Sequence, residues 1–248
     1  MLIVNADDFG KTKSITDNIV RCFQDGRITS TSAMVFMLDS ERAAHVALEQ
    51  KLEVGLHLNF DDPFTGTTQP TTVKECIERT SAFLGRSKYA QVLYNPMLRK
   101  PFEYLYQVQY EEFIRLYRRP PTHINGHHHM HLCSNVLFGN IIPAGSRVRR
   151  SFTFSNGERS GVNRLYRKMV DAIITRRFIS SDAFFAVAAS APLSVLSQNV
   201  KLAKSQNVEL MVHMSSHQEI EFIMQPCFLT TIKDVPLGTY CDLPGRVA

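Results

Sequence analysis

Residues 2–10 read LIVNADDFG. The apolar run Leu2–Val4 predicts a buried strand, and the polar cluster that follows it carries the two carboxylates of Asp7 and Asp8. Active sites of α/β proteins gather at the carboxyl ends of strands. Adjacent residues at a strand end point in different directions, so one carboxylate can bind a metal while its neighbour faces a substrate water. The alternative interpretation of the pair is a helix cap or a solvated turn.

Strands and helices are predicted to alternate along the rest of the chain. The expected strands cover residues 2–4, 28–37, 52–60, 122–126, 147–154 (weaker), 184–187 and 208–213. The expected helices lie between Ser14 and Gly26 and at 41–50, 72–84, 102–118, 161–178, 191–206, and 217–224 or 227–233. Repeated βα units favour a parallel sheet, open or closed into a barrel. We expect a single domain over residues 1–248.

Composition excludes several classes of protein. The 248 residues have a formal net charge of +5, without a basic arm or an RNA-binding platform, so no nucleic-acid partner is expected. No apolar stretch approaches the roughly 20 residues of a membrane helix. The five cysteines form no CxxC pair, and the N-terminus does not resemble a signal peptide. We therefore expect a cytoplasmic protein, with a homodimer as a possible assembly.

Histidines follow the later predicted strands. His57 lies in the apolar segment GLHLNF, where either a metal ligand or a buried core histidine fits. The segment 122–131 reads THINGHHHMH, and in an extended chain His127 and His129 would share one face with Asn125. A face so rich in imidazoles is costly to bury unless a metal or hydrogen bonds satisfy it. Carboxylates and imidazoles at several strand ends are typical of a hydrolytic metal site.

These segments, taken in order, resemble the YdjC-like carbohydrate deacetylases. The similar segments are NADDFG at 5–10, ITSTSAMV at 28–35, GLHLN at 55–59, PTHINGHHHMH at 121–131, VELMVH at 208–213 and LGTY at 237–240. The resemblance spans nearly the whole chain. It implies a distorted or incomplete TIM-like (β/α) barrel of the glycoside hydrolase and deacetylase type.

The resemblance also implies a function and its residues. One divalent metal ion, Mg or Zn, would bind to Asp8, His57 and His127. Asp7 would be the general base and His213 the general acid in hydrolysis of an acetylated amino sugar or oligosaccharide. For contact with the substrate we expect three further residues, which are Asn125, His129 and Arg149.

Two positions depart from the family pattern. Asn125 stands where the family has an aspartate, so it can accept a hydrogen bond but brings no charge. Met214 replaces the proline that follows the late histidine, which puts the loop presenting His213 in question.

Two alternatives to a deacetylase stay open. A metal-dependent phosphoesterase could use the basic cluster Arg147, Arg149 and Arg150 to hold an anion. A two-metal site, however, needs more carboxylates than the motif segments offer. A non-catalytic sugar-binding relative is the other alternative, and the intact set of acidic and histidine residues argues against it.

Overall fold

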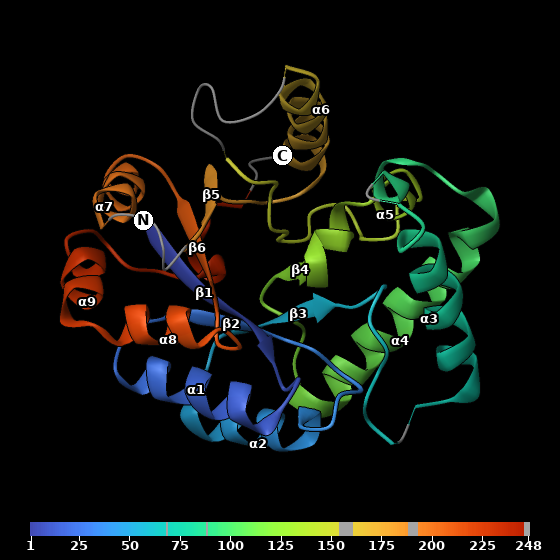
Figure 1. Ribbon diagram of the computed structural model, residues 1–248, viewed down its shortest axis with the longest axis horizontal. Coiled ribbons are helices and arrows are strands. Elements are labelled where there is room, and N and C mark those ends of the chain that lie inside the picture. Colours follow the sequence, from blue (N-terminus) through green and yellow to red (C-terminus); the bar gives the residue numbers. More distant parts are fainter. Residues whose placement is uncertain (68, 88, 154–160, 188–192, 246–248) are drawn as a thin grey trace. The chain divides into compact units, whose positions relative to one another are not determined.

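A computed structural model describes residues 1–67, 69–87, 89–153, 161–187 and 193–245 (Figure 1). Within these ranges, six strands form one sheet in the order β4-β3-β2-β1-β6-β5. The strands are β1 (Leu2–Phe9), β2 (Ser30–Ala33), β3 (Val54–Leu58), β4 (Ile124–Gly126), β5 (Ala183–Ala186) and β6 (Val208–His213). This confirms the predicted class, an α/β fold of the (β/α) barrel type with fewer strands than a complete TIM barrel.

The chain divides into two compact units, and β1 contributes residues to both. The first unit comprises residues 1–7, 17–31 and 145–248. In it, β1 pairs in parallel with β6, and β6 with β5, so the three strands lie side by side (Figure 1). Its helices are α6 (Gly161–Arg177), α7 (Leu193–Leu202), α8 (His217–Met224) and α9 (Pro226–Lys233), together with most of α1 (Lys13–Gln24).

The second unit comprises residues 8–16 and 32–144. In it, β3 pairs in parallel with β4, and α3 packs against α4 (Figure 1). Its helices are α2 (Ser40–Gln50), α3 (Thr71–Leu84), α4 (Arg99–Tyr117) and α5 (Ser134–Phe138), with short 3-10 helices η1 (Ala90–Val92), η2 (Pro96–Leu98) and η3 (His127–Leu132). Among the described helices of either unit, none is long and apolar enough to cross a membrane.

Burial explains why β1 reads as an apolar run. Every residue of this strand is buried, as expected for a parallel strand with both faces covered. The strand extends beyond the predicted Leu2–Val4 and includes Asp7 and Asp8. Both carboxylates therefore lie near its carboxyl end. A helix with Ile15 and Ile19 on its buried face follows, as the spacing of these residues predicts.

Two local predictions are wrong. The segment 147–153 forms no strand: an isolated bridge joins Arg147 to Ile179, and residue 154 lies outside the described ranges. The histidine-rich segment does not continue as an extended chain after Gly126. It turns into η3, with positive φ angles of 48° at His128 and 61° at His129. The expected common face of His127 and His129 is therefore lost.

Candidate metal centre

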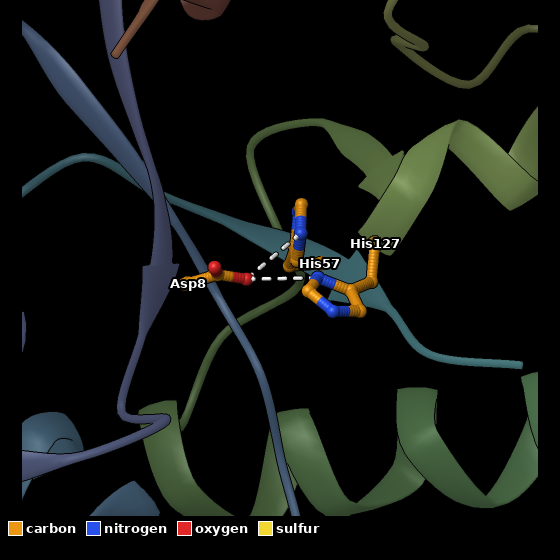
Figure 2. Close-up of side chains that lie close together, drawn as sticks. All are labelled: Asp8, His57 and His127. Atoms are coloured by element: carbon orange, nitrogen blue, oxygen red, sulfur yellow. Dashed lines mark ion pairs between the residues drawn. The ribbon is translucent and has the colours of Figure 1, made fainter. Parts of the chain in front are cut away.

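Three side chains of the second unit converge at the ends of three strands. Asp8 comes from β1, His57 from β3, and His127 from the first residue after β4 (Figure 2). The Asp8 Oδ1 atom lies 3.3 Å from His57 Nε2 and 3.0 Å from His127 Nδ1. One ligand atom from each residue lies within 4.8 Å of the other two. This is the set of residues that the resemblance implies for the metal.

The local backbone turns the Asp8 carboxylate toward the histidines. Asp8 has a φ of 68°, in the left-handed region that aspartate tolerates better than most residues. This conformation interrupts the alternation of side chains along β1. Backbone strain of this kind, typically about 1–3 kcal/mol, is kept where the surroundings hold it in place. Asp8 contacts His57 and His127, whereas the neighbouring Asp7 contacts Arg149.

Burial and charge fix the ionisation of Asp8. Burial raises the pKa of this carboxyl, but hydrogen bonds and charge from His127 and His57 lower it by more. The resulting pKa lies well below the ordinary value for aspartate. Asp8 is thus a carboxylate at any physiological pH, which is the form that binds a metal.

A hydrogen-bonded amide orients His57. Its Nδ1 atom lies 2.7 Å from Asn125 Oδ1, and the Asn125 amide nitrogen donates to Ser32 Oγ at 3.0 Å. Because the amide nitrogen is used in this way, the Asn125 oxygen faces the ring and accepts from Nδ1–H. Nε2 is then the ring nitrogen that faces Asp8 and would bind a metal. Asn125 is completely buried, so the structure places this predicted substrate contact behind His57.

Acidic side chains from the loop after β3 contact the other histidines. Asp62 Oδ2 lies 2.9 Å from His127 Nε2, and Lys11 Nζ lies 3.4 Å from the same carboxylate oxygen. Asp61 contacts His128 Nδ1 at 2.7 Å. The two proposed histidine ligands are thus supported alike. The ring nitrogen that does not face Asp8 contacts the Asn125 oxygen in His57 and the Asp62 carboxylate in His127. One carboxylate oxygen and two imidazole nitrogens with this orientation fit a divalent ion such as zinc.

A second buried cluster, in the first unit, holds Asp7. Arg149 donates to both carboxylate oxygens of Asp7, at 2.6 and 2.8 Å, and its Nε donates to Glu209 at 2.8 Å. Asn5 adds a donor to Asp7 Oδ1 at 2.9 Å. Tyr240 donates to the other oxygen of Glu209 at 2.5 Å. Arg149 is completely buried, which favours a role in holding Asp7 over contact with substrate.

Ionisation in this cluster is set by one guanidinium between two carboxylates. Burial lowers the pKa of Arg149, but the charges of Asp7 and Glu209 raise it well above the ordinary value. Burial raises the pKa of Glu209 in spite of its contacts with Arg149 and Tyr240. The arginine therefore stays charged, and Asp7 receives both of its terminal nitrogens.

His213 lies at the end of β6, as the register partner of Asp7 on β1. Its side chain is partly exposed, and its Nδ1 atom lies 3.7 Å from Glu219 Oε2. The same carboxylate oxygen accepts from the His213 backbone N–H at 2.9 Å. Met214 is buried, and its backbone carbonyl accepts a hydrogen bond from Asn18 at 3.4 Å. The loop after His213, in which Met214 stands in place of the family's proline, is thus held by these hydrogen bonds and by burial of Met214.

The remaining predicted site residue is His129. It is half-buried in η3, with its ring 6.2 Å from that of His131. Among the described residues, neither group with the geometry to bind a metal includes it. The sequence interpretation did not identify Asp62, Glu209 or Tyr240 as site residues. Tyr240 had a signal, because it ends the LGTY segment, whereas Asp62 lies between the expected strand 52–60 and the expected helix 72–84, outside every similar segment.

Comparison with known proteins agrees with the sequence resemblance. The family model described as YdjC-like protein matches residues 1–234. Chitooligosaccharide deacetylases of Yersinia pestis (strain Pestoides F) and Yersinia pseudotuberculosis (serotype O:1b, strain IP 31758) are each 34% identical over 145 residues. The match covers 55% of this chain and 52% of each relative, so the chain spans about half the length of the curated relatives it matches.

A crystal structure shares the fold. It is that of a proposed cellobiose-phosphate cleavage protein from Enterococcus faecalis V583, with a TM-score of 0.70 and 19% sequence identity. The superposition covers 96% of this chain and 97% of the other. At this identity, the likeness supports the architecture alone.

Proposed function

Because the chain belongs to the YdjC-like protein family, we propose that it is a metal-dependent deacetylase that removes the acetyl group of an N-acetylated sugar. The observation that carries the proposal is the convergence of Asp8, His57 and His127 on one point. The names of the Yersinia relatives support an acetylated amino sugar or oligosaccharide as the substrate.

In this proposal, Asp7 is the general base. A bound divalent ion would polarise the acetyl carbonyl and lower the pKa of the attacking water. Asp7 directly precedes the ligand Asp8, and its carboxylate takes the proton that the water loses. Arg149 and Asn5 fix this carboxylate by three hydrogen bonds.

His213 is the proposed general acid. An amine is a poor leaving group unless it is protonated as the C–N bond breaks. His213 is partly exposed, and the Glu219 carboxylate can form an ion pair with the ring once it is protonated. The register places His213 opposite Asp7 on neighbouring strands. This pairing supports a base and an acid that act on one substrate.

The arginine cluster gives less support to a phosphoesterase. Arg149 is engaged by Asp7 and Glu209, and Arg150 pairs with Asp171 at 2.7 Å. These guanidinium groups already have carboxylate partners, so an incoming phosphate would have to displace them. Release of acetate from a panel of N-acetylated sugars, set beside release of phosphate from sugar phosphates, tests the assignment. Acetate release from at least one oligosaccharide is expected; phosphate release alone would contradict it.

For His213→Ala, we expect a much larger loss on amide substrates than on activated acetate esters. An ester with a phenolate leaving group needs little protonation, whereas an amide depends on the acid. The amide turnover should fall by about a hundredfold, while the ester turnover should fall by less than about fivefold. The measurement is the ratio of amide to ester turnover at one pH near neutral.

The matched control is His217→Ala. His217 lies four residues further on, is exposed, and pairs with Glu221 at 3.2 Å on α8. Its replacement should leave both rates near those of the unmodified protein. An equal loss on both substrates in His213→Ala would show that His213 supports the fold or positions the substrate. A loss confined to His217→Ala would transfer the acid role to that residue.

A further inference from the structure

The contact between Asp62 and His127 bears on how the metal ligand is held. Asp62 lies in the loop after β3, and Asn59 fixes this loop by accepting from the backbone N–H groups of Asp61 and Asp62. The Asn59 amide also donates to the Asp62 carbonyl at 2.8 Å. The loop thereby holds the Asp62 carboxylate 2.9 Å from His127 Nε2.

This contact favours one position for the proton of His127 over the other. A neutral imidazole has one N–H, and the other nitrogen has a lone pair. If Nε2–H donates to Asp62, the lone pair of Nδ1 faces Asp8, which lies 3.0 Å away. A carboxylate behind a histidine ligand fixes the ring orientation and makes the ligand nitrogen more basic.

Lys11 could reverse this arrangement. Its Nζ atom lies 3.1 Å from His127 Nε2, so without Asp62 it would donate to that nitrogen. The ring proton would then move to Nδ1, and His127 could no longer bind a metal there. With Asp62 present, Lys11 has a carboxylate partner at 3.4 Å. Its positive charge beside Asp62 also disfavours a second divalent cation among Asp62, His127 and His128.

We propose that Asp62 is a positioning residue that keeps Nδ1 of His127 available to the metal and gives the neighbouring Lys11 a carboxylate partner. The inference rests on the metal assignment of the proposed function. It gives the two histidine ligands different supports, because His57 is held by the neutral amide of Asn125 and His127 by a carboxylate. Asp62 touches neither the metal position nor the reacting atoms in this role.

Metal affinity tests the inference without any measurement of catalysis. The chain is stripped with a chelator, and zinc binding is measured by competition with a chromogenic zinc chelator. Asp62→Ala should weaken binding by about 10- to 100-fold, the usual effect of removing such a support. Asp62→Asn should lose less zinc affinity than Asp62→Ala, because the amide oxygen of asparagine can still accept a hydrogen bond from Nε2–H of His127. Nitrogen-15 NMR should show the Nε2–H tautomer of His127 in the unmodified protein.

Asp61→Ala is the matched control. Asp61 is the neighbouring carboxylate and contacts His128, which is not among the proposed ligands. Its replacement should change zinc affinity by less than about twofold. The inference is overturned if the zinc affinity of Asp62→Ala also stays within twofold of the unmodified protein. It is overturned as well if Asp61→Ala loses as much zinc affinity as Asp62→Ala. It is equally overturned if the unmodified protein binds two zinc ions and Asp62→Ala binds one, because Asp62 would then be a ligand.

A separate variant distinguishes failure of this inference from failure of the proposed function. His57→Ala removes a proposed ligand that contacts Asn125, whereas Asp62 contacts His127. If His57→Ala binds zinc as tightly as the unmodified protein, the metal assignment itself is wrong. If His57→Ala loses zinc while Asp62→Ala does not, only the role of Asp62 is wrong. Thermal unfolding of each stripped variant shows whether it is folded.

Discussion

Asp7→Asn is expected to lower deacetylation turnover by at least about a hundredfold while one metal ion per chain stays bound. That is the usual contribution of a general acid or base. Asparagine keeps an oxygen that accepts from Arg149, but it has no carboxylate to take the proton from water. Asp8, with its own carboxylate turned to His57 and His127, is unchanged by the substitution. Turnover and metal content are measured on the same sample.

Asp25→Asn is the control for this variant. Asp25 is a half-exposed carboxylate of the first unit, 3.9 Å from Arg27, and takes no part in the proposed chemistry. Its turnover should match that of the unmodified protein. Loss of metal together with activity in Asp7→Asn would mean that the roles of the two consecutive carboxylates are exchanged.

His57→Ala and His127→Ala are each expected to lower zinc affinity by about a hundredfold or more, beyond the range for residues that only support a ligand. Each substitution removes one of three ligand atoms, and alanine leaves nothing in its place. Deacetylation should fall to background in both variants at micromolar zinc. Zinc per chain after gel filtration, measured by atomic emission, checks the expectation.

Neighbouring histidines complicate the second of these variants. His128, His129 and His131 lie close in sequence and could supply a surrogate nitrogen to His127→Ala. His57 has no such neighbour on β3, so the two variants must be compared. His45→Ala, on the exposed surface of α2, controls for loss of any histidine. Full zinc occupancy in both ligand variants would exclude this set of ligands.

The strands that carry the site were predictable because buried parallel strands consist largely of apolar residues. The apolar runs of β1 and β6 are buried along their lengths, so they read as strands without any knowledge of the fold. The turn after β4 was not predictable in the same way. His128 and His129 adopt positive φ angles, and the alternation of histidines predicts only what an extended chain would do.

The ligand set could be proposed from the sequence because the motifs lie at strand ends and resemble a known family. The supports of the site could not. Arg149 and Asp7 are 142 residues apart, and their ion pair depends on the folded chain. The sequence predicted a substrate contact for Arg149, whereas the structure places its side chain in the interior. Asp62 and His127, 65 residues apart, meet for the same reason.

One metal ion at Asp8, His57 and His127 is proposed to make the chain a deacetylase. The most direct test titrates the chelator-stripped protein with zinc or magnesium and measures acetate release and bound metal together. An N-acetylated chito-oligosaccharide serves as the substrate. We expect no turnover in the stripped protein, and a linear rise that stops at one bound metal per chain. Full turnover in the stripped protein, or a rise that continues to two metals per chain, would contradict the account.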